Sequence, residues 1–305
     1  MDTHDHHGHL DPDAGDRRVF LAVAVNLGLT IVQVVGGVVA GSLALIADAL
    51  HNFSDAISLI IAFAARKIAR RPADSSMTFG YGRVEIVAAL VNYTTLIVIG
   101  LYLVYAAVGR FIDPPDVDGW LVVAIAAVAL AVDAVTALLT FALSKQSMNI
   151  RAAFLHNVAD ALGSVAVIVA GTLILLYDWR LIDPLVTLLI AAYILWQSFS
   201  QVGPVIRILM LGSPPGIDTE KVVARIATIQ GVCDVHHVHF WQMQEHENAV
   251  DAHLVIEDGA WVQADTIKQQ AKDLLHREFG IGHATIDLER ASGACTGVQT
   301  YGHVG

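Results

Sequence analysis

Six stretches of the chain are hydrophobic over a length that can cross a lipid bilayer, which takes about 20 residues of helix. They cover residues 19–40, 42–65, 84–109, 119–143, 152–177 and 184–206. Turn residues separate them, notably Gly41-Ser42 between the first two and Pro114-Pro115 between the third and fourth. The pattern predicts an α-helical membrane domain with six transmembrane helices.

Beyond Ser213-Pro214-Pro215-Gly216 the pattern changes to that of a small water-soluble domain. Helices are predicted at 218–230, where Asp218 can cap the first turn, and at 261–279. Apolar and polar residues alternate at 234–242, 248–256 and 284–288, as they do in half-buried strands. The order α-β-β-α-β predicts a small α+β domain of the open-faced sandwich type. Its core is small, so we expect dimerisation to stabilise it.

Charged residues are scarce and unevenly placed. They make up 15% of the chain, against roughly a quarter in ordinary soluble proteins. Residues 19–211 carry 21 of them, whereas the 94 residues from 212 to 305 carry 19. This distribution excludes both a wholly soluble and a wholly embedded protein. It predicts an N-terminal tail (1–18), a membrane domain (19–211), a C-terminal domain (212–291) and a flexible tail (292–305).

Charge and cysteine content exclude several classes of protein. The net charge is -11 and no cluster of Lys and Arg forms a phosphate-binding surface, which argues against nucleic acid as a partner. Two cysteines, Cys233 and Cys295, cannot build a disulfide framework. The polar N-terminus is unlike a cleavable signal peptide, so none is expected.

Basic residues in the loops predict the orientation in the membrane. One side of the predicted membrane domain carries ten Lys and Arg residues, and the other carries only Arg110 and Arg180. Short loops rich in Lys and Arg stay in the cytoplasm. We therefore expect a multi-pass protein of the inner or plasma membrane, in contact with lipid, with both termini and the C-terminal domain in the cytoplasm.

The predicted membrane helices contain only two histidines, and both begin the same motif. His51 and His156 each start the pattern His-Asn-x-x-Asp-Ala, which places Asp55 and Asp160 four residues further on. Residues i and i+4 lie on one helix face, so each helix offers an imidazole and a carboxylate together. Two such helices facing each other would supply a tetrahedral set of two nitrogens and two oxygens, which suits Zn²⁺.

A structural interpretation of these residues competes with the metal site. A lone histidine or aspartate in an apolar helix is most often a hydrogen-bonded packing residue. Ionisable groups in a membrane cost roughly 2.5–3.5 kcal/mol each on insertion scales, so a duplicated set without internal Lys or Arg favours a functional site. Asp48 and Asp133 also lie within predicted helices. Each is a candidate for supporting the ligands or relaying protons. A helix–helix hydrogen bond is an equal alternative for Asp48 and the favoured interpretation for Asp133.

The predicted helix boundaries conflict with a shared site in one respect. They put the midpoint of His51 and Asp55 about 12 residues from the inner membrane end, and that of His156 and Asp160 about 6, which is a depth difference of about 9 Å. Either the fifth helix tilts into a water-filled cavity open to the cytoplasm, or the helix boundaries differ from the hydrophobic stretches.

Three stretches of sequence resemble the cation diffusion facilitator family. They are 41–55 (GSLALIADALHNFSD), 79–85 (FGYGRVE) and 236–241 (HHVHFW). The resemblance spans about residues 18–290 and implies a six-helix homodimeric transporter that expels Zn²⁺ from the cytoplasm in exchange for protons. It implies that His51, Asp55, His156 and Asp160 are the transport site, with histidine at the first position associated with zinc rather than cadmium.

The resemblance also bears on metal sites outside the membrane. It implies cytoplasmic ligands at His236 and His253, with Asp265, Asp287 and Glu289 at the partner positions, for a regulatory or dimer-stabilising zinc. As neighbours in a strand, His236 and His237 are expected on opposite faces. Cys233 is a further candidate ligand, or a buried structural thiol. In the loop between the second and third helices, 74–81, Asp74 aligns with family ligands together with Met77 and Tyr81, a poor zinc set, so no loop site is expected.

The histidine-rich stretch 4–9 has the composition of a metal-collecting tail. Other classes of function remain as alternatives. An intramembrane zinc hydrolase would use a motif such as His-Glu-x-x-His, which the sequence lacks, so we do not expect an enzyme. A metal sensor would bind without transport. A broader exporter would also carry Cd²⁺, Co²⁺ or Fe²⁺.

Overall fold

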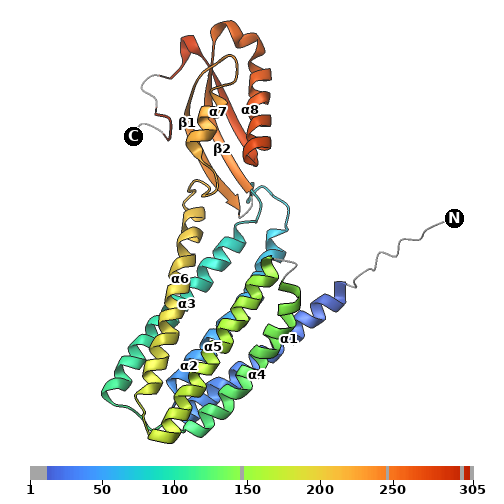
Figure 1. The fold of residues 1–305 in the computed structure, drawn as a ribbon. Helices are drawn as coiled ribbons and strands as arrows, with labels where there is room; N and C mark the ends of the chain where they lie inside the picture. Colours follow the sequence, from blue (N-terminus) through green and yellow to red (C-terminus); the bar gives the residue numbers. More distant parts are fainter. Residues whose placement is uncertain (1–11, 145–147, 245–246, 296–298, 303–305) are drawn as a thin grey trace, which may run out of the picture. The chain divides into compact units, whose positions relative to one another are not determined.

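The computed structural model describes residues 12–144, 148–244, 247–295 and 299–302 (Figure 1). The histidine-rich stretch 4–9 therefore lies outside the described residues. The chain divides into two compact units, one formed by Met1–Ile61 and Asn92–Ser200 and the other by Ala62–Val91 and Gln201–Gly305.

Six long helices correspond to the six hydrophobic stretches. They are α1 (Pro12–Ala40), α2 (Leu43–Ala69), α3 (Val84–Ile112), α4 (Gly119–Ser144), α5 (Met148–Tyr177) and α6 (Ile182–Leu209). Five of them, α2 to α6, are long and apolar enough to cross a membrane over described residues, and α1 contributes the apolar stretch Asn26–Ala40. The predicted helical membrane domain is confirmed. Several helices extend beyond their hydrophobic stretch, because helix formation does not stop where lipid-facing residues end.

Small residues let the membrane helices of the first unit approach closely. A Cβ at Gly119 on α4 would lie 2.6 Å from the carbonyl oxygen of Gly171 on α5. Close backbone approach of this kind is typical of helix pairs in lipid, where burial of apolar surface gives no driving force. Around it, Leu45, Val122 and Val167 form a buried cluster that joins α2, α4 and α5.

The turn between α1 and α2 is held by distant residues of the same unit. Gly41 has a φ of +72°, and Ser42 begins the connection to α2. Asp183, in the first turn of α6 and only 1% exposed, accepts hydrogen bonds from Ser42 Oγ and the Leu43 amide. Arg110 near the end of α3 donates to the Gly41 carbonyl and pairs with Asp183. The beginnings of α2 and α6 and the end of α3 are thereby tied together.

The second unit contains a three-stranded sheet in the order β1-β2-β3. The strands are β1 (Val232–Gln244), β2 (Glu247–Ile256) and β3 (Ile281–Arg290), with β1 antiparallel and β3 parallel to β2. Helices α7 (Thr219–Ile226) and α8 (Ala264–Phe279) pack on the sheet through a core that includes Ile226, Leu254 and Leu275, and a short 3-10 helix (Asp258–Gln263) precedes α8. Asp218 caps α7 as predicted. The predicted α-β-β-α-β order is confirmed.

An irregularity in β1 changes the expected alternation of its histidines. The register against β2 shifts between His236 and His239, and His237 has a φ of +50°. Such a bulge inserts an extra residue, so the residues on either side of it no longer alternate strictly. The expectation that His236 and His237 point to opposite faces is wrong, because their rings lie 5.0 Å apart, centroid to centroid.

The segment 292–305, expected to be a flexible tail, contacts β1 in its described part. The His237 and Val238 amides donate to the carbonyls of Gln299 and Thr300, and Val238 forms a bridge with Tyr301. The bulge exposes these amides at the edge of β1, and an extended segment can satisfy them.

Candidate metal centres

The four membrane residues of the repeated motif come together between α2 and α5. His51 Nε2 lies 3.3 Å from Asp160 Oδ1 and 3.7 Å from Asp55 Oδ2. His156 Nε2 lies 3.4 Å from Asp55 Oδ2 and 3.5 Å from Asp160 Oδ2. Each histidine therefore faces the aspartate of the other helix as well as its own. We call these four residues the membrane quartet.

The nitrogen–oxygen separations in the quartet suit a tetrahedral zinc site, although only His51, Asp55 and Asp160 each place one ligand atom within 4.8 Å of the others. Bonds of 2.0–2.1 Å from zinc to nitrogen or oxygen put the ligand atoms about 3.3–3.4 Å from one another in a tetrahedron. The nitrogen–oxygen distances of 3.3–3.7 Å are close to that edge length. The ligand set needs little rearrangement to hold a divalent cation.

Four polar atoms of the quartet have no hydrogen-bond partner in the described part of the chain. Both ring nitrogens of His51, Oδ2 of Asp55 and Oδ1 of Asp160 are buried and accept or donate no hydrogen bond among the described residues. The contacts between them are close but poorly directed for hydrogen bonding. Buried polar groups are normally paired, so an unpaired set indicates a site for a missing ligand. His156 is the most accessible member, with 35% of its side chain exposed.

A second layer of polar residues lies beside the quartet. Asp48 accepts a hydrogen bond of 2.8 Å from Gln33 Nε2 on α1, and Ser164 Oγ lies 3.2 Å from Asp133 Oδ2 and 3.5 Å from Asp48 Oδ2. Neither Gln33 nor Ser164 is among the site residues predicted from the sequence. The sequence indicates Ser164 only through its position, because it lies four residues after Asp160 and therefore on the same helix face. Tyr193 of α6 adds an edge contact to the His51 ring.

A second group of possible ligands lies on the sheet of the C-terminal unit. His236, His237, His253 and Cys295 each place one ligand atom within 4.8 Å of the others. Glu289 Oε1 lies 2.6 Å from His253 Nδ1, and its Oε2 lies 3.4 Å from His236 Nε2. Three imidazoles, a thiol and a carboxylate are ordinary zinc ligands. We call these five residues the sheet cluster.

Two of the expected cytoplasmic ligands do not join the sheet cluster within this chain. Asp265 belongs to α8, which packs on the face of the sheet that carries Leu254, whereas His253 points to the opposite face. The Asp265 carboxylate is exposed and pairs with Lys268. Asp287 is level with His253 on β3, but it is exposed and accepts from the Leu288 amide. Glu289 supplies the carboxylate in their place.

Hydrogen bonding sets the charge state of the sheet cluster. Burial by itself would raise the pKa of the Glu289 carboxyl, but donation from the Cys295 amide and the His253 ring lowers that pKa to about 2. The hydrogen bond to Glu289 raises the pKa of the Cys295 thiol. Cys233, the other candidate, lies outside the cluster and is exposed, so the expectation of a buried structural thiol is wrong; partial loss of solvent contact, together with nearby carboxylates, raises the pKa of its thiol.

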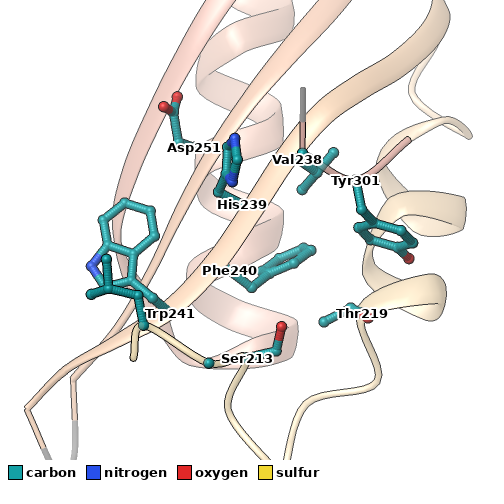
Figure 2. A pocket seen from close by; sticks show the side chains of 11 residues that line it. Ser213, Thr219, Val238, His239, Phe240, Trp241, Asp251 and Tyr301 are labelled. Atoms are coloured by element: carbon teal, nitrogen blue, oxygen red, sulfur yellow. The ribbon is translucent and has the colours of Figure 1, made fainter. Parts of the chain in front are cut away.

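His239 belongs to a separate hollow of about 640 Å³. Figure 2 shows His239 and Asp251 on adjacent strands, with Trp241 and Phe240 further along β1 and Tyr301 across from them. The register pairs His239 with Asp251, two residues along β2 from His253. His239 therefore lies on the same side of the sheet as the sheet cluster but outside it.

The carboxylate of Asp74, in the loop between α2 and α3, accepts hydrogen bonds from other residues of that loop. Asp74 Oδ1 accepts from the Ser76 hydroxyl and from the Ser76 and Met77 amides, and Oδ2 accepts from the Tyr81 hydroxyl at 2.6 Å. These donors, led by the Ser76 hydroxyl, hold the pKa of Asp74 well below its usual value. A carboxylate saturated in this way is a poor metal ligand, and the absence of a loop site stays a prediction.

Comparison with known proteins identifies two family domains in the chain. The model for the cation efflux transmembrane domain matches residues 19–210, and that for the cytoplasmic domain of cation efflux proteins matches residues 214–291. A solved structure described as the metal-bound C-terminal domain of the CzcD transporter from Cuprividus metallidurans matches 24% of this chain and 99% of its own, with 27% identity and a TM-score of 0.23.

Curated relatives cover nearly the whole chain. A cadmium, cobalt and zinc/H(+)-K(+) antiporter of Bacillus subtilis is 34% identical over 286 residues, which is 92% of each chain. The zinc transporter ZitB of Escherichia coli is 33% identical over 94% of this chain and 92% of its own. The metal cation efflux system protein CzcD of Cupriavidus metallidurans is 32% identical over 93% and 90%. This chain therefore belongs to the cation diffusion facilitator family of membrane cation efflux proteins.

Proposed function

We propose that this protein exports Zn²⁺ from the cytoplasm in exchange for protons, with the membrane quartet as the transport site. The observation that carries the proposal is the meeting of two imidazoles and two carboxylates from α2 and α5, with nitrogen–oxygen distances of 3.3–3.7 Å. Two carboxylates neutralise a divalent cation, which is what a site inside a membrane requires. Ring nitrogens of His51 and one oxygen each of Asp55 and Asp160 have no hydrogen-bond partner among the described residues, which supports their use as ligands of the cation.

Proton exchange follows from the chemistry of the ligands. A metal binds only deprotonated imidazole and carboxylate, so zinc and protons compete for the same atoms. His51 and His156 titrate in the physiological range as free side chains and are natural proton carriers. Zinc that binds from the cytoplasm would displace protons, and protons that arrive from the other side would displace zinc.

The range of cations is the main alternative within this function. The Bacillus subtilis relative is named for cadmium, cobalt and zinc, whereas the Escherichia coli relative is named for zinc alone. The nitrogen and oxygen ligands of the quartet favour zinc over the softer cadmium. We propose zinc as the principal substrate, with other divalent cations as secondary ones.

The remaining features of the proposed transporter concern its surroundings. Both termini and the C-terminal domain lie in the cytoplasm of an inner or plasma membrane protein, as the loop bases indicate. The C-terminal domain supports a homodimer, and the sheet cluster binds a zinc ion that regulates the transporter or stabilises the dimer. His236, His237, His253, Glu289 and Cys295 are the ligands we propose there.

Flux in liposomes tests the proposal. Purified protein should move zinc into the lumen when a pH gradient is imposed, and protons should move in the opposite direction. His51→Ala and Asp160→Asn should abolish both movements, whereas Asp178→Asn, which changes an exposed carboxylate paired with Arg180, should leave them unchanged. Zinc flux that ignores the pH gradient would refute the exchange with protons. Binding without flux would identify a sensor instead.

A further inference from the structure

A second pair of carboxylates lies close to the membrane quartet. Asp48 precedes His51 by three residues on α2, and Ser164 follows Asp160 by four residues on α5. Because α2 begins at Leu43 and α5 ends at Tyr177, both displacements point toward the same end of the helices, where the α1–α2 turn lies. The second pair is therefore about one helical turn from the ligand atoms.

One hydroxyl bridges the two carboxylates. Ser164 Oγ lies 3.2 Å from Asp133 Oδ2 and 3.5 Å from Asp48 Oδ2. Asp48 is only 4% exposed, and its Oδ2 also accepts from Gln33 Nε2. A serine hydroxyl has a single hydrogen, so it can donate to only one carboxylate at a time. The other carboxyl group can bond to the serine oxygen only if it carries a proton itself.

The ionisable groups that act on this pair belong to the membrane quartet in the part of the chain that the structure describes. In the described part of the chain, neither Asp48 nor Asp133 pairs with a lysine or arginine. The charged groups that face the two carboxylates are His51, His156 and Asp160. Two neighbouring carboxylates in an apolar region are far better accommodated when one proton is bound between them than when both are ionised.

We propose that Asp48 and Asp133, bridged by Ser164, form a proton-carrying site that is separate from the zinc ligands. The inference rests on the proposed exchange of zinc for protons and adds a carrier to it. Zinc in the quartet brings two positive charges close to the pair and favours both carboxylates in the ionised form, so the pair releases its proton. Departure of zinc lets the pair take up a proton again.

Transfer within the pair is a double hop through the serine. The O–H bond of the protonated Asp48 breaks as its proton passes to Ser164 Oγ, and the hydroxyl hydrogen of Ser164 passes to Asp133. Ser164 ends with one hydrogen, Asp48 becomes a carboxylate, and Asp133 becomes the acid. The total charge does not change, and the proton has crossed from α2 to α4.

Two transport assays on the full-length protein in liposomes test this site. The first measures zinc uptake driven by a pH gradient, together with protons moved per zinc from a pH dye in the lumen. The second measures exchange of labelled for unlabelled zinc with the same pH and the same zinc concentration inside and outside the liposomes. This exchange requires no net proton movement. The variants are Asp48→Asn, Asp133→Asn and Ser164→Ala. The control is Thr172→Val, because Thr172 on α5 donates only to the Ile168 carbonyl of its own helix.

We expect Asp133→Asn and Ser164→Ala to slow gradient-driven uptake by about tenfold and to lower the protons moved per zinc, while zinc exchange stays at the wild-type rate. Unchanged gradient-driven uptake in all three variants would overturn the proposal. Loss of both gradient-driven uptake and zinc exchange in these variants would also overturn the proposal, since the carboxylates would then stabilise the fold or support the metal ligands. Asp160→Asn separates a failure of this proposal from a failure of the proposed transport site. If this variant kept both gradient-driven uptake and zinc exchange, the transport site itself would be refuted.

Discussion

At the scale of single residues, the chemistry of this protein depends on which polar atoms are left without partners. Polar atoms of His51, Asp55 and Asp160 are buried and unpaired among the described residues, whereas Asp183 and Asp74 are saturated with hydrogen bonds. Residue type alone does not distinguish these carboxylates. The unpaired ones are those that can accept a cation without first losing a partner.

Loss of one quartet carboxylate should severely weaken zinc binding. Substitution of a residue that only orients a ligand typically costs 10–100-fold in metal affinity, so Asp55→Asn, which alters a ligand itself, should cost at least about 100-fold. Isothermal titration of zinc into the purified protein measures this, with sheet-cluster binding removed by His236→Ala in both proteins. The exposed Asp178→Asn serves as the matched control. Wild-type affinity in Asp55→Asn would remove Asp55 from the site.

The thiol of Cys295 should react slowly and with a shifted pH dependence. Because the hydrogen bond to Glu289 raises the pKa of this thiol, the thiolate fraction at a given pH is smaller than in a free cysteine, and the midpoint of alkylation lies at higher pH. Glu289→Gln removes the negative acceptor, so it should move the midpoint back toward lower pH. Alkylation followed by mass spectrometry over a pH series measures both midpoints.

The same alkylation experiment, carried out with and without zinc, compares the two cysteines of the chain. Added zinc should protect Cys295 from alkylation and leave Cys233 reactive, because only Cys295 lies in the sheet cluster. Equal protection of both thiols, or of neither, would contradict the proposed ligand set.

At the scale of elements, the connections between helices are more constrained than their sequences suggest. The α1–α2 turn has only Gly41 and Ser42 between its helices, yet Asp183, Arg110 and the carbonyl of Asp116 all lie against it. Gly41 combines a positive φ with close backbone approach, so a side chain at this position meets two obstacles at once.

Gly41→Ala should lower the melting temperature of the purified protein. The φ of +72° disfavours any residue with a Cβ, and that Cβ would lie 2.5 Å from the Asp116 carbonyl oxygen, so we expect a cost of about 1–3 kcal/mol. Gly28→Ala is the control, because a Cβ there meets nothing within 4 Å and alanine favours the helix. Thermal unfolding in detergent compares the two, and an equal melting temperature for both variants would show that the turn can relax.

At the scale of the whole molecule, the two candidate metal centres lie in different compact units. The quartet belongs to the unit of Met1–Ile61 and Asn92–Ser200, and the sheet cluster belongs to the other. They share no residue, so each should be removable without loss of the other.

Metal content should therefore fall in separate steps. Asp160→Asn should reduce bound zinc by one ion per chain, His236→Ala should reduce it by one ion, and the combined variant should bind neither. Elemental analysis of protein purified with zinc and then desalted measures the content. If His236→Ala also emptied the membrane site, the centres would be coupled rather than independent.

The sequence determined a large part of this protein. Hydrophobic stretches predicted the six helices, because lipid requires long apolar runs. The repeated His-Asn-x-x-Asp-Ala motif predicted that His51 and Asp55 share one helix face and His156 and Asp160 another, because helical periodicity is local. The family assignment also followed from sequence and is confirmed by both family domains. The depth offset between the two motifs persists in the structure, because the midpoint of His51 and Asp55 lies 16 residues before the end of α2 and that of His156 and Asp160 lies 10 residues after the start of α5.

Only the tertiary structure decided which residues from distant segments meet. The resemblance implied both Asp265 and Glu289 as partners of His253, but α8 carries Asp265 on the opposite face of the sheet, and Glu289 lies beside His253 together with Cys295. The bulge at His237 cannot be inferred from alternation, because one extra residue reverses the face of all that follow. Ser164 is indicated only by its position four residues after Asp160, and its contacts arise from the packing of α2, α4 and α5, which brings the carboxylates of Asp48 and Asp133 to one hydroxyl.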